Sequence, residues 1–167
     1  MQVKATSVIN IIELLGIITV IVSLLFVAYE INQANKIAMV DSEQAIWENF
    51  STINELIMDN TEFAELMCSM TNEDAVFSDS DLEKVRAFVR RLTNAWSAAE
   101  NSYNNGMLTE QTYQVLYDDV RNLLMTYPGS RQAWQELLDL YPNLTSGFFA
   151  YSRELLNELK LRDGLEN

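Results

Sequence analysis

Residues 8–29 read VINIIELLGIITVIVSLLFVAY, and this apolar stretch decides the fold. Glu13 is the only charged residue among its 22 positions, and about 20 mainly apolar residues are enough for an α-helix to cross the hydrocarbon of a bilayer. A cleaved signal peptide explains the stretch less well, because Lys4 is the only basic residue before it and no small-residue cleavage site closes it. We therefore predict that residues 1–30 form an uncleaved transmembrane anchor.

Small and polar residues in this anchor recur at steps of three and four, so they share one face of a helix. Helices in lipid pack closely through such faces, because small side chains let the backbones approach and polar ones form hydrogen bonds across the contact. Glu13 can take part in that contact, or its carboxyl can reach the headgroup region or stay protonated. The predicted oligomer interface consists of Asn10, Glu13, Gly16, Val20, Ser23, Val27 and Glu30.

Charge and composition argue against several classes of protein. The chain has 24 Asp and Glu against 11 Lys and Arg, which gives a net charge of −13. A surface this acidic repels the phosphates of nucleic acid, so we predict no nucleic-acid partner. The absence of histidine removes the commonest general base and the commonest transition-metal ligand. We accordingly predict no catalytic residue, no metal site and no cofactor, and we expect that the protein is not an enzyme.

Beyond the anchor, apolar residues recur with the period of a helix. Residues 31–45 are polar and contain no helix breaker, so we expect a stalk that continues the membrane helix. Residues 46–167 form the acidic helical domain, in which Asn105-Gly106 and Pro128-Gly129 should end helices. No long stretch alternates with period two. The predicted fold is all-α: a transmembrane helix and stalk followed by an antiparallel bundle of about five helices.

Capping residues indicate where the helices of the domain begin. Ser80 with Glu83 matches a capping box, and Thr109 and Ser130 should open later helices. A short helix over 62–70 and a last helix over 145–161 complete the set. The core-facing residues predicted by steps of three and four are Ile46, Phe50, Ile53, Ile57, Leu82, Val85, Val89, Leu92, Trp96, Ala99, Tyr103, Tyr113, Leu116, Val120, Leu123, Tyr127, Trp134, Leu137, Leu138, Tyr141, Phe148, Tyr151, Leu155 and Leu159.

One polar group on the long central helix resembles a site. Glu100 follows Arg90 and Arg91 by two to three turns on the same helix. A plainer explanation is that the two arginines pair with acidic neighbours such as Glu83 or Asp81 on a solvated face. We favour that explanation, because surface helices commonly carry paired charges.

Two further features have plain explanations. Asp118 and Asp119 are adjacent on a helix, so their side chains diverge by about 100° and do not face each other as an acid and a base would. Cys68 lies among apolar residues and is expected to be a small core residue. The three tryptophans are expected in the core or at its edge: Trp47, Trp96 and Trp134.

Three stretches carry a resemblance to a known group. They are LLGIITVIVSLLFVAYEINQANKIA at 14–38, NGMLTEQTY at 105–113 and YPGSRQAWQELLDLYP at 127–142. The chain resembles, over nearly its whole length, a widespread group of uncharacterised bacterial proteins that have one N-terminal membrane helix and a helical domain. The resemblance implies a single-pass protein of the bacterial inner membrane. It implies no reaction, because the shared stretches contain no catalytic signature.

Basic residues near the two ends of a membrane helix predict which side of the membrane the domain occupies. Lys4 with the α-amino group stands on one side and Lys36 on the other, so the count is nearly equal. Members of the resembled group carry arginines just after the membrane helix, which implies a cytoplasmic domain. This chain departs from them there, because it has Glu30, Asn32 and Gln33 in those places.

These observations lead to one functional hypothesis and two alternatives. We expect a membrane-anchored, non-enzymatic assembly or scaffold protein that contacts membrane lipid and forms a homo-oligomer through its transmembrane helix and stalk. The first alternative is a pore-forming homo-oligomer with Asn10 and Glu13 at its mouth. The second is an accessory subunit of a larger membrane complex.

Overall fold

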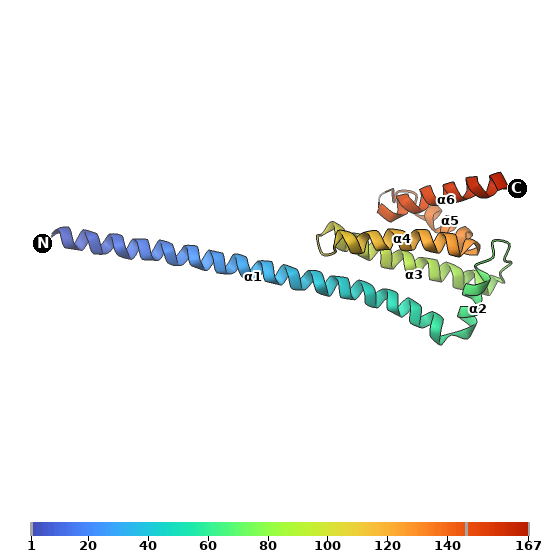
Figure 1. The fold of residues 1–167 in the computed structure, drawn as a ribbon, viewed down its shortest axis with the longest axis horizontal. Helices are drawn as coiled ribbons and strands as arrows, with labels where there is room; N and C mark the ends of the chain where they lie inside the picture. The colour runs from blue at the N-terminus through green and yellow to red at the C-terminus, as the bar shows by residue number, and fades with distance from the viewer. Residues whose placement is uncertain (1, 146, 167) are drawn as a thin grey trace. The chain divides into compact units, whose positions relative to one another are not determined.

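The structure, a computed structural model, describes residues 2–145 and 147–166. Over these residues it is all-helical and has no strand, which confirms the predicted all-α class. A helical bundle is present, whereas an antiparallel arrangement of about five helices stays a prediction. The elements, shown in Figure 1, are α1 (Gln2–Asp59), α2 (Thr61–Ser69), α3 (Asp79–Asn104), α4 (Glu110–Thr126), the 3-10 helix η1 (Pro128–Ser130), α5 (Arg131–Leu140) and α6 (Gly147–Glu166).

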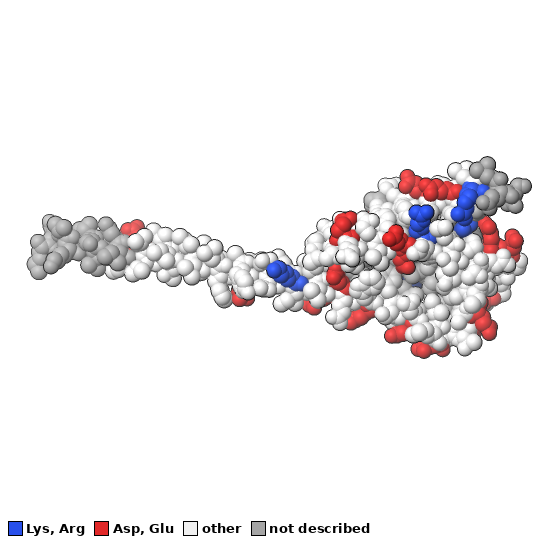
Figure 2. Space-filling model, in the orientation of Figure 1, with Lys and Arg blue, Asp and Glu red and all other residues white. Residues whose placement is uncertain are grey.

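The chain divides into two compact units, Met1–Val40 and Asp41–Asn167. We call them the N-terminal unit and the helical unit. Helix α1 contributes to both, because its residues 41–59 belong to the helical unit. The predicted boundaries of anchor, stalk and domain stay predictions. Figure 2 shows acidic side chains spread over the helical unit, whereas the described part of the N-terminal unit is largely without charge.

The N-terminal unit is an uninterrupted helix whose large apolar side chains are exposed. From Ile12 to Ile31 their exposed fractions lie between 47% and 67%. The hydroxyls of Thr19 and Ser23 donate hydrogen bonds to the carbonyls of Leu15 and Thr19, each at 2.8 Å. An α-helix pairs its backbone groups internally, as lipid requires. By length and composition this helix can cross a membrane.

An aromatic cluster forms the centre of the helical unit. Trp96 of α3 and Trp134 of α5 are almost fully buried, with ring centroids 5.4 Å apart in a stacked arrangement. Phe148 of α6 packs against Trp96 at 6.0 Å. Stacked aromatic pairs contribute about 0.5–1.5 kcal/mol beyond the area they bury. Helices α3, α5 and α6 therefore meet at one tryptophan.

Residues 41–59 of α1 join the helical unit through apolar and polar contacts. Ile46 and Ile53 are each only 4% exposed. Near them, the Glu43 carboxylate accepts hydrogen bonds from the backbone N–H of Thr109 at 3.2 Å and from the Thr112 hydroxyl at 3.0 Å. These bonds lower the pKa of Glu43. Because helix N-termini favour negative charge, this carboxylate also suits the start of α4.

Most core-facing residues predicted from spacing pack as expected. The fully buried ones are Ile46, Ile53, Val85, Val89, Leu92, Trp96, Ala99, Leu116, Val120, Trp134, Leu137, Leu138, Phe148, Leu155 and Leu159. Phe50, Ile57, Leu82, Tyr103, Tyr113, Leu123, Tyr127 and Tyr151 are partly buried. Trp47 lies at the edge of the core and is 45% exposed.

Two residues predicted to be buried are exposed. Tyr141 is 47% exposed, because it is the C-cap of α5 and its backbone has left the helical geometry on which the spacing argument relies. Cys68 is exposed as well. Helix α2 buries Phe63, Leu66 and Met67, and the step of about 100° from Met67 to Cys68 turns the thiol away from the core. The prediction of a core cysteine was wrong.

Two of the predicted helix caps need correction. The N-cap of α3 is Ser78 rather than Ser80: its hydroxyl accepts a hydrogen bond from Asp81 N–H at 3.2 Å. This earlier start places Asp79 and Asp81 in the first turn, where the helix dipole favours carboxylates. Helix α5 begins directly after Ser130, as predicted, but Ser130 makes no capping hydrogen bond, because its backbone is already helical as part of η1 whereas an N-cap is extended. Thr109 caps α4 as predicted.

Replacement of the α3 cap should therefore distinguish the two serines. We expect Ser78→Ala to lower the free energy of unfolding by about 1 kcal/mol, because the N–H of Asp81 loses its acceptor. Ser80→Ala is the matched control and should change it by less than about 0.5 kcal/mol. Urea unfolding followed by tryptophan fluorescence measures both. If Ser80→Ala lowers the free energy of unfolding more than Ser78→Ala does, Ser80 rather than Ser78 is the N-cap of α3.

Candidate functional site

The predicted interface residues follow one face of α1 in the N-terminal unit. The side chain of Asn10 lies outside the described residues. The six others are exposed, and the steps of three and four between them keep them on a common face of the continuous helix. They are Glu13, Gly16, Val20, Ser23, Val27 and Glu30.

Gly16 and Ser23 give this face its shape. A Cβ added at Gly16 would meet no atom within 4 Å, so the single chain does not itself require glycine there. Ser23 already donates its hydroxyl proton to the carbonyl of Thr19. Its contribution to a helix contact is therefore small size and a free acceptor lone pair, not a donated hydrogen bond.

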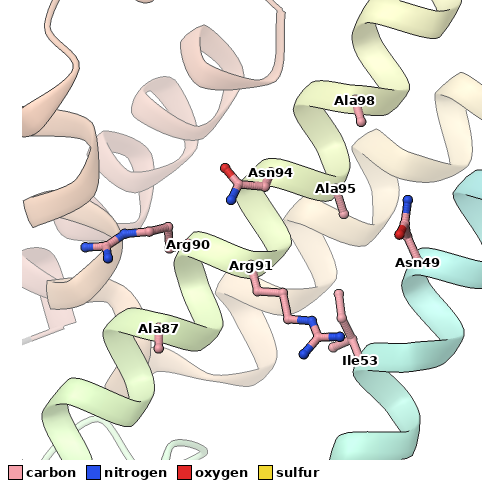
Figure 3. Close-up of a pocket in the computed structure, with 8 residues that line it drawn as sticks. All are labelled: Asn49, Ile53, Ala87, Arg90, Arg91, Asn94, Ala95 and Ala98. Carbon is pink, nitrogen blue, oxygen red and sulfur yellow. The ribbon is translucent and has the colours of Figure 1, made fainter.

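A second feature is a depression in the helical unit between residues 41–59 of α1 and α3, with a volume of about 400 Å³. Figure 3 shows Arg91 extending toward Ile53 of α1, whereas Arg90 points to the other side of α3. The expected pairing of these arginines with Asp81 or Glu83 was wrong. Asp81 pairs with Lys84 and Glu83 pairs with Arg86, each three residues on. A separation of seven or more residues is too long for such pairs.

Glu100 does not join the two arginines. Ten residues of helix, or about 15 Å, separate it from Arg90. It lies instead against Gly147 at the first residue of α6, where an added Cβ would overlap the Glu100 carboxylate. Gly147 also has a φ of +54°, which glycine adopts without strain. The contact is one of close packing between α3 and α6.

The third feature is a groove with an acidic residue inside it. It has a volume of about 380 Å³ and lies between residues 47–57 of α1, the middle of α3 and the face of α4 that carries Leu116 and Leu123. We call it the Asp119 groove, because Asp119 is the only charged residue among the described residues that line it. Its principal walls are Trp47, Phe50, Ile57, Phe88, Val115 and Tyr127.

The surroundings of Asp119 disfavour its charged form. Burial raises the pKa of the Asp119 carboxyl, and the indole N–H of Trp96 opposes that rise. The two groups nevertheless do not form a hydrogen bond of regular geometry, because the buried Trp96 Nε1 has no hydrogen-bond partner within the described residues. Asp118 points outward and is exposed. Two neighbouring aspartates therefore have different environments.

The sequence contained a signal for Asp119 that the comparison with Asp118 obscured. Asp119 stands three residues after Leu116 and four before Leu123, so it occupies a core-facing position of α4. A carboxylate at such a position is unusual, since acidic residues are seldom buried without a partner.

Comparison with known proteins identifies no relative. No protein-family model matches the chain, and neither the curated proteins nor the solved structures give a match.

Neutralising Asp119 should stabilise the helical unit. Because the folded state binds the Asp119 proton more tightly than the unfolded state does, stability is lost as pH rises from the ordinary pKa of 3.8 through the raised value. We expect Asp119→Asn to raise the unfolding temperature at pH 7 and to lose that advantage as the pH falls toward 4. Thermal melts of the whole chain across this pH range measure it.

The control for this experiment is Asp118→Asn, which removes the same charge from an exposed position. Its melting temperature should follow that of the unaltered chain at every pH. An Asp119→Asn chain that is less stable at pH 7 would mean that the ionised carboxylate stabilises the fold.

Proposed function

We propose that this protein is a membrane-anchored, non-enzymatic assembly protein that self-associates through its N-terminal helix and stalk. The observation that supports the proposal most directly is the exposed face of small and polar residues on α1, set in an apolar helix that can cross a membrane. In this proposal residues 1–30 anchor the chain in a bacterial inner membrane, and residues 46–167 form an antiparallel bundle of about five helices on the cytoplasmic side.

The physics of lipid supports association through this face. Apolar side chains gain little by leaving lipid for another apolar surface, so helices in a bilayer associate through close packing and hydrogen bonds. Gly16 and Ser23 offer the shortest side chains of the face, seven residues and about two turns apart. Both allow the backbone of a second helix to approach.

The distribution of charge favours self-association through the anchor rather than through the helical unit. The chain carries a net charge of −13, and the acidic residues are concentrated beyond the anchor. Copies of an acidic domain repel one another at short range, although salt screens this repulsion beyond about 8 Å. Attraction between the membrane helices has to exceed that repulsion.

Enlarging the small residues of the face should dissociate the oligomer. In a mild detergent we expect the unaltered chain to have at least twice the monomer mass of 19.1 kDa. Gly16→Leu combined with Ser23→Leu should reduce the particle to the monomer mass, because the larger side chains hold the backbones apart. Light scattering coupled to size-exclusion chromatography measures the mass.

The control is Ala28→Leu, which also introduces a leucine in place of a small residue but about 100° from Val27 and off the proposed face. It should leave the mass unchanged. Since a side chain at Gly16 meets nothing in the single chain, loss of the oligomer would report a contact between chains. A monomeric unaltered chain, or equal effects of the double variant and Ala28→Leu, would contradict the proposal.

A further inference from the structure

The Asp119 groove combines one carboxylate with a mainly apolar and aromatic wall. Trp47 and Phe50 lie on the α1 side, with ring centroids 6.4 Å apart, and Tyr127 follows the end of α4. The remaining polar lining is uncharged: Ser51 and Asn54. A volume of about 380 Å³ lies in the range of about 300–1,000 Å³ that small-molecule sites occupy.

Asp119 is partly buried and has no cation paired with it among the described residues. It differs in this from Glu136, which pairs with Arg86 of α3, and from Glu43, whose carboxylate accepts hydrogen bonds from Thr109 and Thr112. In the described part of the chain no Lys or Arg forms an ion pair with Asp119. A partly buried carboxylate without a cation costs free energy that an apolar residue at the same position would not.

A bound cation would remove that cost. An ammonium group beside Asp119 supplies the missing opposite charge, and the faces of Trp47, Phe50 and Tyr127 can contact both a cation and an apolar substituent. An anion would meet the carboxylate with the same sign of charge. A neutral apolar molecule would leave the carboxylate unpaired and desolvate it further.

We propose that the Asp119 groove binds an organic cation with an apolar body, whose ammonium group pairs with the Asp119 carboxylate while its apolar part lies against the aromatic walls. The site is distinct from the proposed membrane contact, because all its residues belong to the helical unit. The groove belongs to each single chain and does not depend on self-association.

Two ammonium compounds test the proposal: 2-phenylethylamine and benzyltrimethylammonium. Each is titrated into the full chain in phosphatidylcholine nanodiscs at pH 7.5, with empty nanodiscs as the background. Tryptophan fluorescence and calorimetry follow binding, because Trp47 lines the groove. We expect saturable binding of at least one ammonium compound, and binding of 2-phenylethanol, the neutral counterpart of the amine, that is at least tenfold weaker.

Variants assign the binding to the groove. Asp119→Asn should weaken the binding of 2-phenylethylamine at least tenfold, whereas Asp118→Asn should leave the affinity for this amine unchanged. Val115→Lys is a second, independent variant. It places an ammonium group one helical turn from Asp119, where it should compete with the amine and lower the affinity for it at least tenfold. Val115→Gln, of similar length but neutral, should retain binding. Circular dichroism confirms that each variant remains folded.

The outcomes separate the proposal from a purely structural role for Asp119. If Asp119 only serves as a polar neighbour of Trp96, the amine and the alcohol will bind equally or neither will bind. Either result would overturn the proposal, as would an Asp119→Asn chain that binds the amine like the unaltered one. Failure of both ammonium compounds to saturate at millimolar concentration would also overturn it. Oligomeric mass, measured on the same samples, reports separately on the membrane contact.

Discussion

The uncovered apolar surface of residues 12–31 is the constraint on which the rest of the structure depends. Burying one large aliphatic side chain away from water is worth about 1.5–3 kcal/mol, and the chain itself buries none of those between Ile12 and Ile31. The helix over these residues therefore needs an apolar surrounding. Its internal backbone pairing and its hydroxyl bonds to carbonyls one turn earlier leave few polar groups for that surrounding to satisfy.

The helical unit obtains its stability differently, from a core of its own. The aromatic centre of this core consists of Trp96, Trp134 and Phe148, which come from three different helices. The end of α1 is attached to this unit by Ile46 and Ile53 and by the Glu43 carboxylate at the start of α4. This attachment also creates the walls of both cavities beside α1. The shape of both cavities therefore depends on the position of residues 41–59 of α1 in the helical unit.

Sequence reasoning predicted α3 and α4 best, because both are long and amphipathic and end beside clear stop signals, Asn105-Gly106 and Pro128-Gly129. Leu116, Val120, Leu92 and Trp134 are buried as their spacing requires. It failed where two local patterns overlap, as at Ser78 and Ser80, since either serine can cap a helix and each is followed by two acidic residues in the first turn.

The candidate site was harder to predict, because it depends on contacts between helices distant in sequence. The groove around Asp119 exists only because Trp47 and Phe50 of α1 lie across from α4. No local pattern predicts that α1 and α4 lie across from each other, although the spacing of α4 predicts that Asp119 faces inward. That Glu13, Gly16, Val20, Ser23, Val27 and Glu30 share one face could, by contrast, be predicted from their spacing alone, because it requires only that residues 13–30 be one helix.

Cys68 has a practical consequence. It is the only cysteine of the chain, and its sulfur is exposed on α2 of the helical unit. A maleimide that cannot cross a bilayer will consequently attach at one defined point, and only when added to the compartment that holds this unit. The natural protein thus carries its own reporter of topology, with no residue to be engineered in or removed.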